Sequence, residues 1–213
     1  LEDIKVDVDS IILEPCGRNT APAIAIAALK LKDSSNKNLL VLSADHEIKN
    51  SVKFLDIIEK ATKYADQSKL VTFGIEPTKP ETGYGYIEVV EDYKKEPLKA
   101  LNIKRFTEKP NKEKAIKFLS EERYLWNSGI FLFNAKIIID EISKFSPDII
   151  QFCLKALKES KKDLAFTRLS YESFSKCPNI SIDNAVMEKT ESAVVLPLDV
   201  GWSDVGSWKS IWE

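Results

Sequence analysis

The 213-residue sequence predicts an α/β fold built around a largely parallel sheet. Short apolar runs alternate along it with segments whose apolar residues recur at helical spacing, which is the pattern of β-α-β units. One run, residues 39–42, is apolar throughout, as is typical of strands that are buried on both faces. Because neither a repeat nor a linker interrupts this alternation, we predict a single domain over residues 1–213.

Each predicted element follows from a local signal. The strand at residues 11–13 precedes a helix that Asn19 or Thr20 caps. The glycine- and proline-rich stretch 77–86 predicts a loop that leads into a strand at residues 87–90. Further strands are predicted at residues 39–42, 70–75, 101–107, 129–133 and 193–196, and further helices at 52–65, 136–144, 147–158 and 182–189, with shorter ones from Pro110 and from Gly206.

The charge balance and the cysteine count exclude several classes of protein. There are 31 lysine and arginine residues against 33 aspartate and glutamate residues, without a basic block of the kind that binds nucleic acid. The longest apolar stretch, residues 21–31, is too short to span a bilayer, and the first residues lack the basic start of a secretory signal. Three cysteines without C-x-x-C spacing and one histidine exclude a disulfide framework and a zinc site. We therefore predict a cytoplasmic protein that binds neither nucleic acid nor membrane.

Several well-known catalytic motifs are missing. Gly83 and Gly85 lack the third glycine of G-x-G-x-x-G and precede a strand, where a dinucleotide site requires a helix. The sequence contains neither a G-x-x-x-x-G-K-[ST] loop nor a G-x-S-x-G elbow. These absences exclude dinucleotide, P-loop and serine-hydrolase chemistry.

Two aspartates follow strands of the predicted sheet. Asp45 comes after the strand at residues 39–42, and Asp204 comes after the strand at residues 193–196. Ligands of open α/β sheets bind where strands end, and paired carboxylates suit a Mg²⁺ ion that also holds substrate phosphates. The residues alone favour another interpretation, in which each aspartate caps the helix that follows it, and Asp204 before Gly206 and Ser207 is an ordinary cap.

Other polar residues flank strands in the same way. Glu14 lies at a strand end before a helix, where its carboxylate can accept two hydrogen bonds from guanine or simply be solvated. Glu108, Lys109 and Asn127 can bind sugar hydroxyls or a phosphate, and their alternatives are a surface ion pair and a turn. Asp183 and Lys189 lie on one predicted helix, where a surface role is equally plausible.

The order of these motifs resembles that of bacterial mannose-1-phosphate guanylyltransferases, from Glu14 to the end of the chain. Each motif alone is modest, but their order and the long final match are specific. The matching stretches are residues 14–23 (EPCGRNTAPA), 44–46 (ADH), 83–87 (GYGYI), 106–110 (FTEKP), 126–131 (WNSGIF), 181–183 (SID), 185–189 (AVMEK) and 201–208 (GWSDVGSW).

The resemblance implies a fold, a reaction and a set of site residues. The fold is a Rossmann-like α/β/α sandwich of the nucleotide-diphospho-sugar transferases, with a mixed, mostly parallel sheet. The reaction joins GTP and mannose 1-phosphate to give GDP-mannose and pyrophosphate. The implied residues are Asp45 and Asp204 for Mg²⁺, Glu14, Arg18, Asn19, Thr20 and Asp45 for the nucleotide, Gly85, Glu108, Asn127, Asp183 and Lys189 for the sugar, and Asp45, Asp204 and Lys109 for catalysis.

The sequence also departs from the family. Ser43 stands where the family usually has proline, and Asn184 where it usually has tyrosine. The family's glycine-rich strand and loop, which hold the GTP phosphates, would precede Leu1, so we expect this chain to be a fragment that binds GDP-mannose but is incomplete for catalysis. Many relatives also carry an isomerase domain of cupin type. Another sugar-1-phosphate nucleotidyltransferase and a non-catalytic sugar-nucleotide binding module are the alternatives, and a homo-oligomer is left open.

Overall fold

The computed structural model describes residues 8–31, 37–95 and 98–205. Contacts group the chain into two compact units. The first unit comprises Leu1–Asp33 and Ile139–Val186, and the second comprises Ser34–Ile138 and Met187–Glu213. The helix expected from Gly206 lies outside the described residues. The single nucleotidyltransferase domain stays a prediction, and each unit is described by itself.

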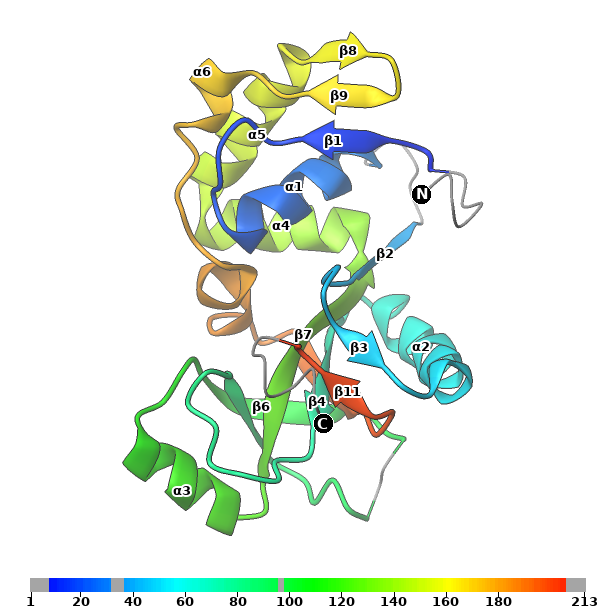
Figure 1. Cartoon of the computed structure of the whole chain (residues 1–213), viewed down its shortest axis with the longest axis vertical. Helices are drawn as coiled ribbons and strands as arrows, with labels where there is room; N and C mark the ends of the chain where they lie inside the picture. Colours follow the sequence, from blue (N-terminus) through cyan, green and yellow to red (C-terminus); the bar gives the residue numbers. More distant parts are fainter. Residues whose placement is uncertain (1–7, 32–36, 96–97, 206–213) are drawn as a thin grey trace. The chain divides into compact units, whose positions relative to one another are not determined.

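The first unit combines a small sheet with helices. β1 (Ile11–Leu13) is parallel to β9 (Phe166–Arg168), which is antiparallel to β8 (Lys161–Asp163), and the three lie side by side in Figure 1. The helix α1 (Thr20–Lys30) contacts α5 (Pro147–Lys158), and α5 contacts α6 (Tyr171–Phe174). Alanines at the α1 surface allow this close approach, since Ala21, Ala25 and Ala28 are fully buried.

The thiols of the first unit are all free. Cys16 is half-buried, whereas Cys153 and Cys177 are buried with their sulfur atoms 3.7 Å apart. Each sulfur therefore has the other as a neighbour inside the core between α5 and the segment after α6, although neither is joined in a disulfide.

The second unit is built on a six-stranded sheet with the order β2-β7-β4-β10-β6-β5, in which β5 pairs with β7 as well. The strands are β2 (Asn38–Val41), β4 (Leu70–Ile75), β5 (Tyr86–Val89), β6 (Leu101–Thr107), β7 (Tyr124–Asn134) and β10 (Ala193–Pro197). The helix α4 (Ala135–Phe145) follows β7 directly. These elements confirm the predicted mixed α/β fold.

The sheet is less parallel than predicted. Only the β4–β10 ladder of this sheet is parallel among the described residues, and its other ladders are antiparallel. The register nevertheless gives β2, β4, β5 and β10 one common direction, because each lies beside β7 or β6, which run the opposite way. The prediction of a mostly parallel sheet is therefore correct in that four of the six strands run in one direction. It is wrong for the pairing of neighbouring strands, which is mostly antiparallel.

Two helices cover apolar clusters of the second unit. α2 (Ser51–Ala65) packs Phe54 and Ile57 against the sheet residues Phe73 and Leu196. The cluster under α3 (Lys112–Ser120) consists of Tyr86, Ala115, Phe118, Tyr124 and Trp126. A short antiparallel ladder joins β3 (Glu47–Ile48) to β11 (Trp202–Ser203). No helix among residues 8–31, 37–95 and 98–205 is both long and apolar enough to cross a membrane.

Two local predictions differ from the structure, and one structural element was not predicted. The strand predicted at residues 39–42 is β2, which has one neighbour and is only half-buried, so burial on both faces was wrong. The helix predicted at 182–189 is a π-helix, η2 (Asp183–Met187). The hairpin β8–β9 was not predicted, because its strands are short and largely exposed and lack an apolar period.

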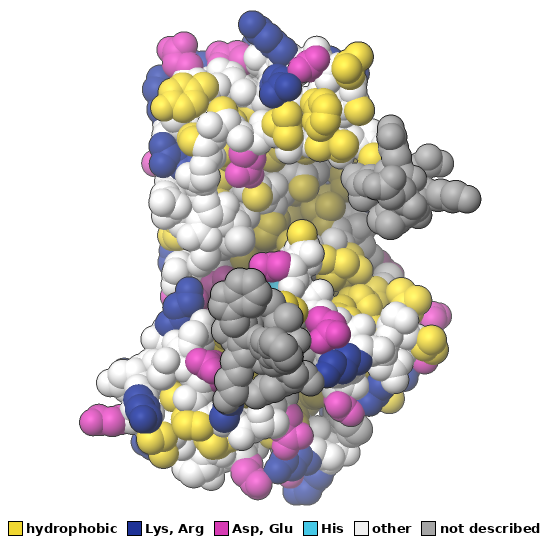
Figure 2. Space-filling view, viewed as in Figure 1, with side chains coloured by type: hydrophobic (Ala, Val, Ile, Leu, Met, Phe, Trp, Pro, Cys, Tyr) yellow, Lys and Arg dark blue, Asp and Glu magenta, His cyan; other side chains and the backbone are white. Residues whose placement is uncertain are grey.

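On the face seen in Figure 2, acidic and basic side chains are interspersed.

Candidate functional site

Three residues that were predicted to bind the sugar lie together in the second unit. Gly85, Glu108 and Asn127 lie on neighbouring strands or directly beside them, since Tyr86 of β5 pairs with both Thr107 of β6 and Trp126 of β7. The Asn127 N–H donates to the Gly85 carbonyl at 2.8 Å. A Cβ added to Gly85 would lie 2.7 Å from Glu108 Oε2 and 3.4 Å from Asn127 Cβ. The absence of a side chain at Gly85 therefore makes room for the Glu108 carboxylate.

The orientation of the Asn127 side chain is set by its neighbours. Its amide oxygen accepts hydrogen bonds from the Thr72 hydroxyl at 3.1 Å and from the Gly129 N–H at 3.3 Å. Gly129 has a φ of +71°, a conformation that favours glycine. The Ser128 hydroxyl donates to the Phe73 carbonyl at 2.7 Å and holds this part of β7 against β4, where the register of the two strands shifts. The amide therefore points in one fixed direction.

Lys109 lies directly after Glu108 and bonds to it only loosely. Its ammonium nitrogen is 3.3 Å from Glu108 Oε1, and its side chain is 66% exposed, against 28% for Glu108. Exposed ion pairs of this kind contribute about 0–1 kcal/mol, so the ammonium can turn to an anionic ligand at little cost. Lys109 also has a φ of +44°, an unusual backbone conformation for a residue with a side chain.

The ladder β3–β11 brings together the segments that carry Asp45 and Asp204. Trp202 pairs with Ile48 and Ser203 with Glu47, so Asp204 directly follows the last paired residue of β11, and Asp45 lies two residues before β3. Asn50 caps α2 by accepting from the Lys53 N–H at 2.9 Å, so Asp45 is not the cap of that helix. The helix that Asp204 was expected to cap lies outside the described residues.

Tyr84 connects Asp204 to the Gly85 region. Its hydroxyl donates to Asp204 Oδ1 at 2.7 Å. Burial and the Asp204 carboxylate raise the pKa of Tyr84 well above its ordinary value, so its proton stays in place as a donor. Tyr84 is the residue before Gly85. This bond therefore connects Asp204, which follows the β3–β11 ladder, to the cluster of Gly85, Glu108 and Asn127, here called the sugar-side cluster. Sequence reasoning did not single out Tyr84, and the GYGY motif that contains it was the available signal.

An aromatic cluster lines the same region and was also not predicted. It consists of His46, Tyr84, Trp126 and Trp202. The ring of Tyr84 lies edge-on to Trp126 at 5.2 Å and to Trp202 at 5.6 Å, and His46 lies edge-on to Trp202 at 5.2 Å between ring centroids. The Trp202 indole N–H donates to His46 Nδ1 at 3.2 Å. Trp202 belongs to the GWSDVGSW motif, but its partners can be seen only in the folded structure.

The donor set of the second unit fits a Mg²⁺ ion that takes most of its ligands from water and substrate. Asp45 is exposed and Asp204 is half-buried. The Tyr84 hydroxyl donates to Oδ1 of Asp204. Mg²⁺ is usually held by one or two carboxylates together with phosphates and waters. Among the described residues there is no group of three or more acidic, histidine or cysteine side chains able to hold a metal alone.

Four of the five predicted nucleotide residues belong to the first unit, and Asp45 belongs to the second. Three of those four, Asn19, Arg18 and Thr20, have structural partners. The Asn19 side chain accepts from the Thr20 N–H at 2.9 Å and caps α1. The Arg18 guanidinium donates to the Ser175 carbonyl. The Thr20 hydroxyl accepts from the Ile182 N–H at 2.9 Å. These bonds fix the turn between β1 and α1.

Glu14 follows β1 at the beginning of that turn. The residue is exposed as a whole, yet its carboxyl lies close enough to protein atoms for burial to raise its pKa. Asp183 opens η2 in the first unit, whereas Lys189 lies exposed in the turn after η2 and belongs to the second. The roles of all three stay predictions.

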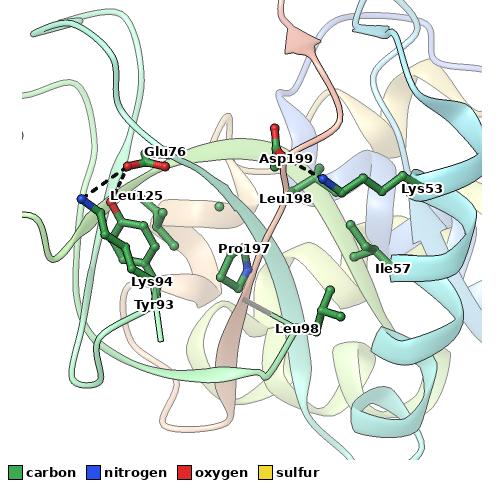
Figure 3. Close-up of a pocket in the computed structure, with 11 residues that line it drawn as sticks. Lys53, Ile57, Glu76, Tyr93, Lys94, Leu98, Leu125, Pro197, Leu198 and Asp199 are labelled. Carbon is green, nitrogen blue, oxygen red and sulfur yellow. Dashed lines mark hydrogen bonds and ion pairs between the residues drawn. The ribbon is translucent and has the colours of Figure 1, made fainter. Parts of the chain in front are cut away.

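The second unit also contains a cavity of about 480 Å³ that none of the predicted site residues lines. Figure 3 shows it between Lys53 and Asp199 on one side and Lys94 and Glu76 on the other. Lys53 is 2.8 Å from Asp199, and Lys94 is 3.6 Å from Glu76. Both lysines of this cavity are therefore already paired, and its remaining lining is mainly apolar, so it is a poor match for a phosphate.

Comparison with known proteins covers the whole chain. The family model described as nucleotidyl transferase matches residues 2–213. The mannose-1-phosphate guanylyltransferase of Salmonella montevideo is 51% identical over 100% of this chain, which spans 45% of that protein.

Two solved structures are also similar. One is titled as a mannose-6-phosphate isomerase from Helicobacter pylori, with a TM-score of 0.81 and 34% identity over 90% of this chain and 74% of that one. The other is titled as a mannose-1-phosphate geranyltransferase from Thermus thermophilus, with a TM-score of 0.79 and 29% identity over 93% of this chain and 55% of that one.

Proposed function

The chain belongs to the nucleotidyl transferase family, and from this premise we propose that the protein transfers GMP from GTP to mannose 1-phosphate, forming GDP-mannose and pyrophosphate. The chain spans less than half of the length of the guanylyltransferase to which it is similar. One observation carries the proposal. Gly85, Glu108 and Asn127 lie together, and the hydrogen bond from Tyr84, the neighbour of Gly85, connects this cluster to Asp204.

In the proposed reaction, a phosphate oxygen of mannose 1-phosphate attacks the α-phosphorus of GTP. A new P–O bond forms as the bond to the β-phosphate oxygen breaks, and pyrophosphate leaves with that electron pair. The attacking phosphate has a second pKa of about 6, so it needs no general base at neutral pH. The residues therefore have to align two anions and offset their charge.

The second unit supplies the sugar side of the proposed site. Glu108 accepts hydrogen bonds from mannose hydroxyls, and the fixed amide of Asn127 helps to set which hydroxyl faces it. The absence of a side chain at Gly85 lets the Glu108 carboxylate lie close to the backbone there. Lys109 offsets the charge of the mannose phosphate, and we propose the same role for Lys189. Asp183 is proposed to accept hydrogen bonds from the mannose.

Asp45 and Asp204 would hold Mg²⁺. A bound Mg²⁺ would neutralise phosphate charge and orient the triphosphate. Tyr84 keeps Asp204 in one orientation through the 2.7 Å hydrogen bond, and the ladder β3–β11 keeps Asp204 near the Asp45 loop.

For the nucleotide, we propose that the Glu14 carboxylate accepts from the N1–H and the exocyclic amine of guanine. Asn19 uses its amide oxygen to cap α1, so the NH₂ group is the part of that side chain to meet the base. Arg18 and Thr20 hold the turn that presents Glu14. A carboxylate at this position favours guanine over bases without paired donors. The cytoplasmic location and the oligomeric state stay predictions.

The test is pyrophosphate release by the complete protein with each pairing of GTP, UTP or dTTP with mannose 1-phosphate or glucose 1-phosphate. We expect GTP with mannose 1-phosphate to be the best pair. Asp204→Asn should lower turnover far more than thermal stability. Asp199→Asn is the matched control, because Asp199 is 96% exposed and lies outside the proposed site. The proposal would be contradicted if another pair of nucleotide and sugar phosphate gave the highest rate. It would also be contradicted if Asp204→Asn and Asp199→Asn lost turnover equally.

A further inference from the structure

We infer that His46 is a further substrate-binding residue, whose Nε2–H donates a hydrogen bond to a phosphate oxygen of the bound substrates, and that Trp202 is the positioning residue that fixes the required tautomer. The inference rests on the proposed function, because that function places phosphates beside Asp45 and Asp204. It adds a neutral donor to a site in which the other proposed phosphate contacts are a metal ion and lysines.

The Trp202–His46 hydrogen bond determines where the imidazole proton lies. An indole N–H can only donate, and it points to His46 Nδ1 at 3.2 Å. Nδ1 must therefore carry a lone pair. In the neutral ring the single proton is then on Nε2, so His46 presents a donor at its opposite nitrogen.

The indole itself is held on several sides. Trp202 pairs with Ile48 in the β3–β11 ladder, so its backbone position follows from the register. Its ring meets the His46 ring at an angle of 88° and the Tyr84 ring at 68°. An edge-on contact to each neighbour limits rotation of the indole and keeps its N–H directed at His46.

The His46 ring lies among residues of the proposed site. A Cβ placed on Gly129 would lie 3.7 Å from His46 Cε1, the ring carbon between Nδ1 and Nε2. That carbon therefore faces the part of β7 that follows Asn127, and the Trp202 indole takes Nδ1 on one side of it. Asp45 is the residue before His46, and Asp204 follows Ser203, whose ladder partner is Glu47. Within residues 8–31, 37–95 and 98–205, the hydrogen bond to Trp202 involves Nδ1, and no protein acceptor is seen for Nε2.

Two isosteric variants of His46 separate the roles of the two nitrogens. In His46→Gln the side-chain NH₂ reaches approximately the Nε2 position, whereas in His46→Asn it reaches approximately the Nδ1 position. We measure binding of GDP-mannose by calorimetry in the complete protein, together with thermal unfolding. We expect His46→Ala and His46→Asn to bind roughly 10–100-fold more weakly, as for a lost hydrogen bond to a charged acceptor, and His46→Gln to recover most of the affinity.

The role of Trp202 has its own measurements. ¹⁵N NMR of histidine-labelled protein, with the His46 signal assigned by its loss in His46→Gln, should show the Nε2–H tautomer in the wild type and a mixture in Trp202→Phe. The binding losses of Trp202→Phe and His46→Ala should not add in the double variant, because Trp202 acts through His46.

Three results would overturn the inference: an Nδ1–H tautomer in the wild type, equal affinities of His46→Gln and His46→Ala, or unchanged affinity in His46→Ala. These results are distinct from a failure of the proposed function. If the wild type does not release pyrophosphate from GTP and mannose 1-phosphate but the tautomer and the binding series behave as expected, only the assigned reaction is wrong.

Discussion

Gly85→Ala gives the sharpest test of the sugar-side cluster. The added Cβ would lie 2.7 Å from Glu108 Oε2, and ordinary contacts begin at 3.4 Å, so one of the two must move by about 0.7 Å (3.4 − 2.7). Glu108 Oε2 ends a flexible side chain whose ion pair with Lys109 is loose, so we expect the carboxylate to move rather than the backbone. The free energy of unfolding should fall by no more than about 1 kcal/mol.

The same displacement should have a large effect on activity. A catalytic or binding group that moves by ~1 Å can cost about 100-fold in rate, so we expect kcat/KM for mannose 1-phosphate to fall roughly 10- to 100-fold at saturating GTP. The KM for GTP should change little. Initial rates of pyrophosphate release in the complete protein provide the measurement, with thermal unfolding of each variant alongside.

Gly83→Ala is a matched control in the same loop. Its added Cβ would meet only Glu81 Oε1, at 3.5 Å, which is an ordinary contact. The reasoning is refuted if Gly85→Ala retains full kcat/KM for mannose 1-phosphate, or if Gly83→Ala loses as much as Gly85→Ala does.

Three other expected outcomes concern single side chains. Tyr84→Phe removes the 2.7 Å donor to Asp204, so the Mg²⁺ concentration for half-maximal rate should rise about 10- to 100-fold, whereas an unchanged Mg²⁺ dependence would show that the bond orients no metal ligand. Glu14→Gln places an N–H donor against the donors of guanine and should weaken the binding of GTP by roughly 1–3 kcal/mol relative to that of UTP. An unchanged preference for GTP in competition assays would show that Glu14 does not contact the base. Lys104 and then Arg105 hold the pKa of Glu88 below its ordinary value, so its contribution to stability is complete above the unfolded pKa and is lost as pH falls through the lower folded pKa. Glu88→Gln should therefore destabilise the protein by about 1–3 kcal/mol at pH 7, and urea unfolding should show the difference shrinking in acid; a difference independent of pH would contradict this assignment.

Elements with a strong local signal could be predicted from the sequence. The strands β4 and β10 and the helices α2 and α5 lie within one or two residues of their expected bounds, because apolar period and caps are local properties. The edge position of β2 is different. It depends on the insertion of β7 between β2 and β4, which no local pattern encodes.

The candidate site was predictable to a similar extent. Gly85, Glu108 and Asn127 were named through motif resemblance, and the sheet register then showed that they lie together. His46, Tyr84 and Trp202 were missed as functional residues because each acquires its partner over a long separation in sequence. A lone histidine argues against zinc, but its pairing with an indole can be seen only after folding.

The double pairing of β5 has a mechanical consequence. Because β5 is bonded to β6 and also to β7, the ladders β7–β4, β4–β10, β10–β6, β6–β5 and β5–β7 form a closed circuit. A strand in such a circuit cannot separate without breaking hydrogen bonds along both of its edges, so slow amide exchange is expected around the whole ring. The rim that carries Gly85, Glu108 and Asn127 is therefore stiff before any ligand binds. Binding of the proposed sugar there would lose little ordering entropy, and the adaptable part of the proposed site would be exposed side chains such as Lys109.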